Sequence, residues 1–299
     1  MFTQTAPDNT DQFSPYDWTL FLTISVLWGA SFALIDIGLD SLAPGVITFG
    51  RIALGALTLR ILPTPKVTIA SGDRRKLGTL AIVWVALPFT LFPLAEQHIN
   101  SATTGLLNGG MPIVAALVAT FLVRQPPTRL QTMGITIGFL GIAGISLPSI
   151  TSGANQALGV LLVLGAIVSY GFAINMAAPL QQKYGSVALM AKMLAVASAF
   201  TFPFALPGLA NSQFAVRPVL AVAALGILGT GAAFAVMASL VGRVGATRAS
   251  FITYLIPVVS LVLGVLLRGD SVAPLALVGV VLVILGAVLA SRSPRQDRS

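Results

Sequence analysis

The chain has no cysteine, a single histidine and few charged residues. Without cysteine it forms no disulfide, no thiolate metal site and no cysteine nucleophile. One histidine does not make a histidine-rich metal centre, so no metal is expected. Charged residues make up 9% of the chain and hydrophobic residues 56%, whereas soluble domains carry about 25% charged residues. So few charged residues cannot cover the surface of a soluble protein. Lipid must therefore be the solvent for much of the surface of this chain.

Sequence motifs that drive chemistry are also missing. The chain contains no G-x-x-x-x-G-K-[ST] loop for nucleotide phosphates, and no pair of acids lies deep in an apolar segment. Glu96-Gln97-His98 resembles a fragment of a zinc motif but lacks the second histidine. We therefore expect no cofactor, no catalytic residue and no enzymatic activity. The net charge of +8 is scattered between apolar segments, which is typical of a membrane topology signal and not of nucleic-acid binding.

Ten apolar segments are long enough to span a bilayer, which requires roughly 20 residues. The start, Met1 to Tyr16, has no Lys or Arg, so we expect the first segment to stay in the membrane instead of being cleaved as a signal peptide. The composition predicts an all-α membrane protein. The expected transmembrane helices are Asp17–Gly38, Pro44–Leu62, Lys76–Ala95, Ser101–Val123, Leu130–Pro148, Ala157–Ala178, Val187–Pro207, Pro218–Leu240, Ala246–Leu267 and Ala273–Ala290.

The second half of the chain repeats features of the first half. A shift of 145 residues pairs prolines and glycines of the two halves: Pro112 with Pro257, Gly134 with Gly279, and Gly141 with Gly286. A shift of 141 residues pairs two cations inside apolar segments, Arg51 and Lys192. Each half then contains five helices. Because five is odd, the second half must enter the membrane in the opposite sense.

This pattern predicts two inverted five-helix repeats, residues 17–148 and 157–290, with tails at 1–16 and 291–299. Inverted repeats recur in secondary transporters, whose substrate site lies near the midplane between the repeats. Basic residues in the short loops predict that both termini are cytoplasmic. The expected inner side carries thirteen Lys and Arg, against Arg217 and Arg268 on the outer side.

Six of the expected helices carry polar and aromatic residues at helical spacing, and we interpret these faces as the wall of a central cavity. The alternative is that the hydroxyls bond to their own helices and the rings fill gaps between helices. The candidate substrate-binding residues are Trp28, Ser31, Phe32, Trp84, Asn108, Met111, Tyr170, Asn175, Met237, Thr253 and Tyr254. Pro112 and Pro257, at matching places in the two halves, are candidate hinges, although prolines also produce static kinks.

Four charged or titratable residues are candidate contacts for a substrate or a proton. Arg51 and Lys192 lie inside expected spans, where each could snorkel to the interface or contact substrate; Arg51 could also pair with Asp36 or Asp40. Glu96 and His98 are expected in an outer loop, most simply at the surface. They are the only pair in the sequence that suggests proton transfer.

The fifth and tenth helices are almost purely aliphatic and rich in glycine, including Gly134 and Gly138. Such faces permit close helix packing. We expect these two helices at the periphery, against lipid or a partner subunit, with packing inside one chain as an equal alternative. Both a monomer and a homodimer are therefore compatible with the sequence.

Short motifs in this order resemble the EamA domain of the drug/metabolite transporter superfamily. Leu27-Trp28-Gly29-Ala30-Ser31-Phe32 resembles the opening of that domain, and Phe49-Gly50-Arg51 its second-helix arginine. Two segments are similar to its fourth helix, Ala102 to Pro112 and, in the second half, Ala246 to Pro257. The second half departs at Tyr170-Gly171, where Trp-Gly is expected, and at Lys192.

The resemblance implies ten helices in two EamA repeats, a central cavity and alternating access. It also implies substrates such as amino acids, nucleotide sugars, other metabolites or drugs, and it is closest to the bacterial aromatic amino-acid exporter branch. We expect an exporter of amino acids or related small metabolites in the bacterial inner membrane, with the bilayer and the substrate as its partners. The alternatives are a transporter of another solute, such as a nucleotide sugar or a drug-like compound, a channel, or a membrane enzyme or assembly factor.

Overall fold

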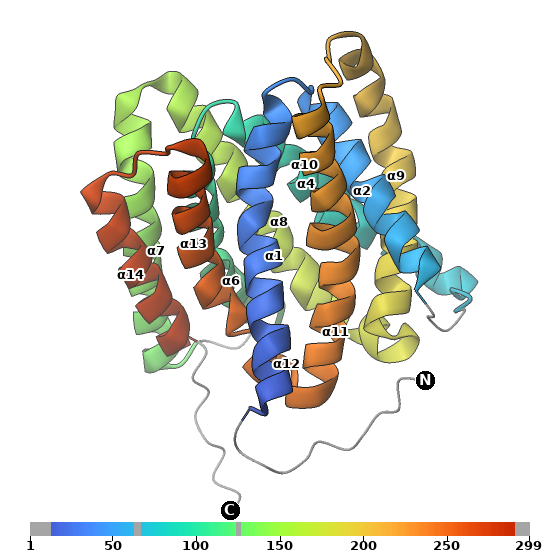
Figure 1. The fold of residues 1–299 in the computed structure, drawn as a ribbon. Coiled ribbons are helices and arrows are strands. Elements are labelled where there is room, and N and C mark those ends of the chain that lie inside the picture. Colours follow the sequence, from blue (N-terminus) through green and yellow to red (C-terminus); the bar gives the residue numbers. More distant parts are fainter. Residues whose placement is uncertain (1–12, 63–66, 124–126, 291–299) are drawn as a thin grey trace, which may run out of the picture.

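A computed structural model of the chain describes residues 13–62, 67–123 and 127–290. The expected tails lie mostly outside the described residues, as do Lys66, Arg124, Arg292, Arg295 and Arg298 of the predicted charge pattern. Within the described ranges the fold is entirely helical (Figure 1). Eight helical segments are long and apolar enough to cross a membrane, and two shorter apolar ones, Ile252–Arg268 and Pro274–Ala290, bring the number to ten.

The first five of these ten rods are formed by α1 (Pro15–Leu39); α2 (Pro44–Ile61); η1 (Ser71–Asp73), α3 (Arg74–Leu80), η2 (Ala81–Ala86) and α4 (Leu87–Glu96); α5 (Ser101–Asn108) and α6 (Met111–Val123); and α7 (Arg129–Ser152). The second five are formed by α8 (Ala154–Tyr184); α9 (Ser186–Ala210); α10 (Val216–Gly226), η3 (Ile227–Ala232) and α11 (Ala233–Val244); α12 (Ala246–Ala249), α13 (Ile252–Leu263) and η4 (Gly264–Arg268); and α14 (Pro274–Ala290). These rods coincide with the ten predicted spans.

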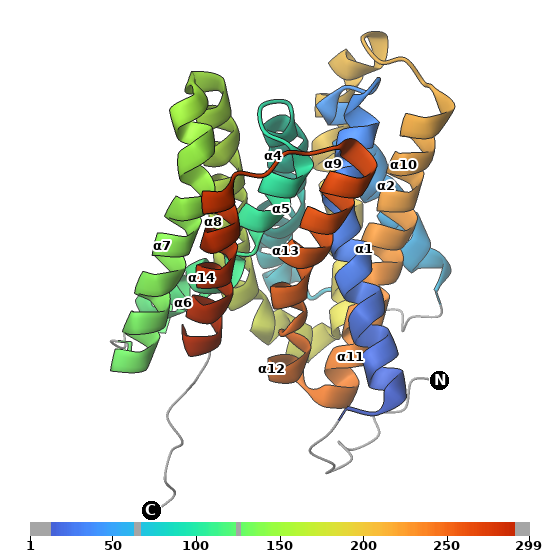
Figure 2. The same cartoon turned by 60° about the vertical axis from the view of Figure 1, so that its left-hand side comes forward.

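The two sets of five run in opposite senses through the bundle. We call the side where α1 begins and α14 ends the terminal side, and the opposite side the distal side. α1 begins on the terminal side, whereas α8, the first helix of the second set, begins on the distal side (Figures 1 and 2). The prediction of an all-α membrane protein with two inverted five-helix repeats is confirmed.

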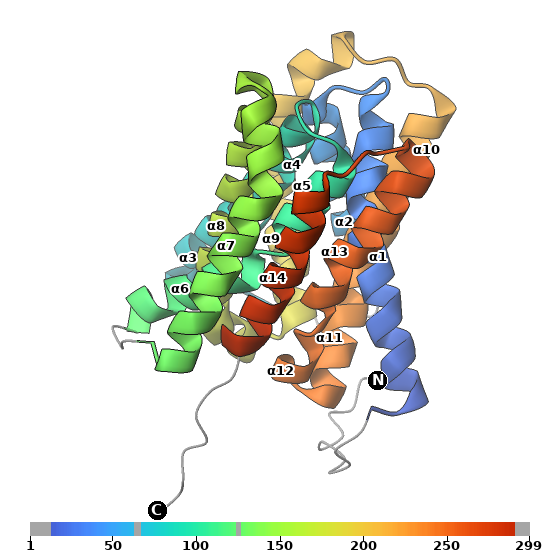
Figure 3. The same cartoon turned by 90° about the vertical axis from the view of Figure 1, so that its left-hand side faces the viewer.

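Helix packing follows the repeat. α7 packs along α14 and α2 along α9, so each of these pairs joins the same helix of the two repeats. α1 packs on α13, and α8 packs on α5 and α6, which is the same contact with the repeats exchanged. The α7–α14 pair forms one edge of the bundle, seen face-on in Figure 3, and the α2–α9 pair lies at the other (Figure 1). The remaining helices occupy the middle.

Sequence explains where several rods begin. Ser14 accepts a hydrogen bond from the Asp17 backbone, and the Asp17 carboxylate bonds back to Ser14, which is a capping box at the start of α1. Thr128 and Gln131 make the same arrangement for α7. These caps satisfy backbone donors at the helix starts, which is a strict requirement near a bilayer.

Three of the described helical rods contain a π-helical turn, η2, η3 and η4, and the first two of these turns lie at equivalent places in the repeats. η2 begins at Ala81 and η3 at Ile227, 146 positions later (227 minus 81), and both are six residues long. π-turns are frequent at functional sites because they leave backbone groups to be satisfied from elsewhere. The Ser169 hydroxyl on α8 donates to the carbonyl of Val83 in η2 at 2.6 Å. The sequence did not predict either turn.

The rods that contain the candidate hinge prolines are both interrupted. The first is broken at Gly109 and Gly110, directly before Pro112, the second residue of α6. The second is broken at Ser250 and Phe251, before α13, so Pro257 lies inside that helix instead of at its break. A hinge role for the two prolines stays a prediction.

Glycine contacts join α7 to α14 within one chain. A Cβ atom on Gly141 would lie 2.6 Å from both the Gly279 carbonyl oxygen and the Val283 amide nitrogen, which are backbone atoms that cannot move aside. Gly286 meets the backbone of Gly138 in the same way. The two aliphatic helices therefore do lie at the edge, and their glycine faces pack against each other.

We expect Gly141→Ala to destabilise the protein by about 1–3 kcal/mol, the usual cost of overpacking a close contact. The measurement is thermal unfolding of the purified protein in detergent. The matched control is Gly78→Ala in α3, where an added Cβ meets nothing within 4 Å and alanine is the better helix former. Equal melting temperatures for the two variants would show that the α7–α14 contact is not tight.

Candidate functional site

Aromatic rings from both repeats meet in the middle of the bundle. Trp28 on α1 contacts Phe234 on α11 edge-on, with ring centroids 5.8 Å apart. Phe32, one turn along α1, contacts Phe92 on α4 at 5.5 Å, and Phe92 contacts Tyr170 on α8 at 6.0 Å. Phe32 and Phe92 are buried, while Trp28, Tyr170 and Phe234 are half-buried. The chain of rings therefore lies on the seam between the repeats, where the sequence predicted a cavity wall.

Arg51 on α2 is buried, with only 6% of its surface exposed. Its Nε donates to the Thr230 hydroxyl in η3 at 3.0 Å, and its guanidinium carbon lies 3.7 Å from the centre of the Phe89 ring on α4. Thr48, almost one turn before Arg51, donates to the Phe89 carbonyl at 3.0 Å. Arg51 therefore joins α2, α4 and η3, which come from both repeats.

No carboxylate among the described residues forms an ion pair with Arg51. Asp36 and Asp40, which the sequence offered as partners, bind Arg268 instead. Nor does Arg51 snorkel to an interface, since it is buried. A buried cation without a counter-ion is unfavourable by several kcal/mol, although the Phe89 face offsets part of that cost. The site is thus complementary to an anionic group.

Asn108 is the second residue of the middle helices whose polar side chain has unused hydrogen-bonding capacity. It is the last residue of α5, directly before the Gly109–Gly110 break, and its buried Oδ1 has no hydrogen-bond partner in the described part of the chain. Asn175 differs, because its amide donates to the carbonyls of Ala115 and Gly171 at 3.1 and 2.8 Å. Asn175 therefore ties α8 to α6, and Asn108 is the better candidate to bind a donor.

Four other predicted wall residues lie around the rings. Trp84 in η2 is half-buried and packs on the same cluster of buried side chains as Tyr170 and Phe234. Met111 packs with Trp28 and Tyr170 on a second cluster, and Met237 with Trp28 on a third. Ser31 is buried and donates to the Leu27 carbonyl of its own helix, which is the alternative that the sequence left open.

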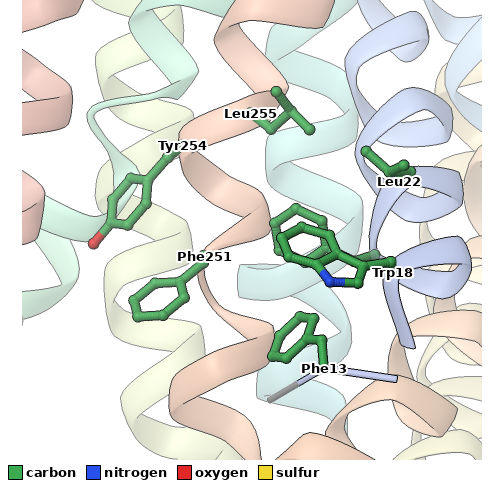
Figure 4. Close-up of a pocket in the computed structure, with 7 residues that line it drawn as sticks. Phe13, Trp18, Leu22, Phe251, Tyr254 and Leu255 are labelled. Atoms are coloured by element: carbon green, nitrogen blue, oxygen red, sulfur yellow. The ribbon is translucent and has the colours of Figure 1, made fainter. Parts of the chain in front are cut away.

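Thr253 and Tyr254 lie at the start of α13, directly after the break at Ser250 and Phe251. Thr253 donates to the Ser250 carbonyl at 2.8 Å. Tyr254 stacks on Phe251 at 5.9 Å, and both line an open surface hollow of about 780 Å³ between α13 and α1. In Figure 4 the Tyr254 hydroxyl points away from Trp18 and Leu22, the residues of the opposite wall. Tyr254 therefore borders a different surface, and the Thr253 hydroxyl bonds to the preceding turn of its own segment.

The remaining charged candidates divide into exposed and buried groups. Lys192 is exposed on α9 and does not occupy a place equivalent to that of buried Arg51. His98 is half-buried in the turn after α4. Glu96 was expected at the surface, and that expectation is wrong: it is 7% exposed, because it ends α4, which packs on α1, α2, α5 and α8.

Polar contacts on the distal side were not predicted from the sequence. Arg268 at the end of η4 binds Asp36 on α1 at 2.6 Å and Asp40, the residue that caps the end of α1, at 2.8 Å. Asp270 accepts hydrogen bonds from the Ser101 hydroxyl at 2.7 Å and from the Ala102 amide at 2.9 Å. We call these contacts the distal clamp. It ties the distal ends of α1, α5 and η4 together, over the aromatic rings.

The middle helices form two groups that touch mainly beneath this clamp. Group one is α3–η2–α4, α5–α6 and α8, and group two is α1, α10–η3–α11 and α12–α13–η4. Contacts between the groups run through α4 and α5, the distal halves of their rods, with Gly105 of α5 against Ser260 of α13. On the terminal side the ion pairs of Asp17 with Arg243 and of Asp73 with Lys183 each stay inside one group. The ion pairs of Arg268 on the distal side also stay inside one group, so the part of the clamp that joins the two groups is the contact of Asp270 with α5.

Sequence comparison assigns a family to this fold. The model of the EamA-like transporter family matches residues 18–147 and again residues 157–292. The chain belongs to the EamA-like transporter family. The family resemblance expected from the sequence is thus confirmed over nearly the whole chain, and each match covers one set of five helices.

Other EamA-like transporters align over nearly their full length. A "Probable terminal-alkyne amino-acid exporter" of Streptantibioticus cattleyicolor is 27% identical over 281 residues, covering 92% of this chain and 93% of the relative. An uncharacterized transporter of Archaeoglobus fulgidus is 24% identical over 275 residues, covering 92% and 98%. A solved crystal structure shares the fold with a TM-score of 0.61 at 19% identity, covering 92% and 96%.

The contact between Arg51 and Thr230 should contribute to the stability of this EamA-like transporter. Replacing Thr230 by Val removes the acceptor for the buried Nε donor, and an unsatisfied buried group costs about 1–3 kcal/mol. We expect Thr230→Val to lower the melting temperature in detergent, whereas Thr230→Ser, which keeps the hydroxyl, should unfold near the wild-type temperature. A Val variant as stable as the Ser variant would contradict this role.

Proposed function

We propose that this EamA-like transporter exports amino acids or closely related small metabolites across the bacterial inner membrane by alternating access. The observation that carries the proposal is buried Arg51, a cation without a counter-ion beside half-buried aromatic rings. An amino acid supplies what this site lacks, because its carboxylate can pair with the guanidinium in a bidentate contact. An apolar or aromatic side chain would pack on Trp28 and Tyr170.

The single cation also favours this substrate class over a nucleotide sugar. A diphosphate group would need several buried positive charges, and Lys192, the other cation inside a span, is exposed on α9. The free acceptor of Asn108 is suited to an ammonium donor of the substrate. The exporter relative of S. cattleyicolor supports amino acids as the class, and the resemblance to the aromatic amino-acid exporter branch supports an aromatic side chain.

Alternating access is supported by the unequal contacts of the two middle groups. On the distal side they are joined by the contact of Asp270 with Ser101 and Ala102 and by the packing of α4 and α5 on α1 and α13. We infer that the present conformation is closed on the distal side, and that the clamp must separate for the substrate to leave. The positive-inside pattern of basic residues supports a cytoplasmic terminal side, which makes the distal side external.

Transport should depend on Arg51 and not on Lys192. We expect purified protein in liposomes to exchange radiolabelled phenylalanine or another member of an amino-acid panel. Removing one partner of a buried charge pair costs about 2–5 kcal/mol, so Arg51→Gln should weaken substrate affinity at least about thirtyfold. Lys192→Gln, the matched control, should transport at the wild-type rate. The measurement is initial exchange rate against substrate concentration.

Two results would overturn the assignment. The first is that no member of the panel exchanges above protein-free liposomes, which would remove the substrate class. The second is equal affinity in Arg51→Gln and wild type, which would remove the proposed carboxylate contact. Because Trp28 and Trp84 border the site, quenching of tryptophan fluorescence by the same amino acids gives a binding measurement that is independent of transport.

The proposed orientation can be tested because the chain has no native cysteine to give background labelling. Gln213 lies in the exposed distal loop between α9 and α10, and Gly72 is exposed on the terminal side in η1. We expect a membrane-impermeant maleimide to label Gln213→Cys in intact cells and Gly72→Cys only after permeabilisation. The reverse pattern would place the terminal side outside.

A further inference from the structure

Glu96 is a buried acid that the proposed substrate contacts do not use. It is the last residue of α4 and 7% exposed, and neither of its carboxyl oxygens has a hydrogen-bond partner in the described part of the chain. Most buried polar groups in proteins are satisfied, so an exception of this kind calls for an explanation. Both oxygens are open to something that the protein itself does not provide.

The charged groups around Glu96 come mainly from the distal clamp. α4 packs on α1, α2, α5 and α8. α5 carries no titratable residue, and α8 presents Tyr170, which contacts Phe92 one turn before Glu96. The charged groups that act on the Glu96 carboxyl are the acids Asp36 and Asp270 and the cations Arg51 and Arg268. His98 lies in the turn that follows.

None of these cations is bound to Glu96. Arg268 is engaged by Asp36 and Asp40, and Arg51 lies between Thr230 and Phe89. An ionised carboxylate that is buried without a hydrogen bond is strongly unfavourable. The position therefore requires a bound proton or a bound metal cation in this conformation.

A proton fits this site better than a metal ion. Hard cations need six or more oxygen ligands, usually including several carboxylates. Among the described residues, no group of three or more His, Cys, Asp or Glu side chains converges. A proton needs only one of the two free carboxyl oxygens of Glu96.

We propose that Glu96 is the proton-binding site of this chain and that it couples closure of the distal clamp to the proton gradient. The proposal rests on the proposed function, because coupling needs a transported substrate. When the clamp is open, water reaches Glu96 from the distal side and a proton binds to its carboxylate. That proton removes one negative charge next to Asp270. Asp270 can then bind Ser101 and Ala102 on α5 more readily, and this is the clamp contact that joins the two groups.

This arrangement makes the carrier an antiporter. The empty carrier returns to the distal-closed state with Glu96 protonated, and the substrate-loaded carrier opens distally after the proton has left on the terminal side. One proton is bound on the distal side and released on the terminal side for each substrate that leaves. The neutral carboxyl of Glu96 and the contact of Asp270 with α5 thus form one unit.

The coupling is tested in liposomes with radiolabelled phenylalanine as the probe. With one-for-one exchange, a gradient of one pH unit drives about tenfold accumulation. We expect Glu96→Gln, which mimics the protonated acid, to keep phenylalanine exchange without a gradient and to lose the pH-driven accumulation entirely. His98→Gln, the nearest titratable neighbour, should accumulate substrate as the wild type does. Accumulation in Glu96→Gln equal to that of wild type would overturn the proposal.

A second measurement does not need any substrate. Infrared spectra of the purified wild-type protein at neutral pH should show the carbonyl stretch of a protonated carboxylic acid, and Glu96→Gln should lack it. Asp73→Asn, which removes an acid ion-paired to Lys183 near the surface, should leave that band unchanged. If the band is absent from wild type, the proton site is wrong even where transport is found. If the band is present and no amino acid moves, the substrate proposal fails alone.

Discussion

The structure depends on the rule that polar groups inside a bilayer must be satisfied within the protein. Almost every described hydroxyl in the spans obeys it by bonding to a carbonyl of its own helix or of a neighbouring helix. Arg51, Glu96 and Asn108 stand out against this background. Among the residues that the structure describes, the guanidinium has no ion-pair partner, the carboxyl has no donor, and the amide oxygen has no hydrogen-bond partner. All three lie in or near the middle helices. In a carrier, the polar groups that bind a substrate or a proton there must lack partners within the protein.

Glycine provides the scaffold that holds these groups in place. α7 and α14 contact through backbone atoms at Gly141 and Gly286, whereas at Gly105 the backbone of α5 meets the side chain of Ser260 on α13. The two contacts differ in whether they can separate during transport. The α7–α14 contact runs along whole helices at one edge of the bundle (Figure 3), so it can act as a fixed frame. The α5–α13 contact involves only the distal half of one rod, directly before the break at Gly109, so it can separate without disturbing that frame.

Sequence was sufficient for features that periodicity and composition determine. The ten spans, their opposed sense and the ring positions Trp28, Phe32 and Tyr170 follow from apolar length, the repeat and helical spacing. Features that depend on contacts between distant segments were out of reach. Arg268 meets Asp36 and Asp40 across more than two hundred residues, and the π-turns η2 and η3 carry no compositional mark. The sequence places Glu96 in a loop, and its burial follows only from the packing of α4 on α1 and α5. Tyr254 has the right spacing but borders another surface.

The departures from repeat symmetry matter more for function than the symmetry itself. Two identical halves would place equal sites on both sides of the midplane and give the substrate no preferred partner. Here Arg51 is buried, whereas its counterpart Lys192 is exposed. One rod breaks at Gly109, and the equivalent rod breaks at Ser250, a different point of the repeat. The buried cation Arg51 and the rod break at Gly109 therefore both lie in the first half of the chain. The repeat supplies two alternative states, and its asymmetric residues determine what is bound in each.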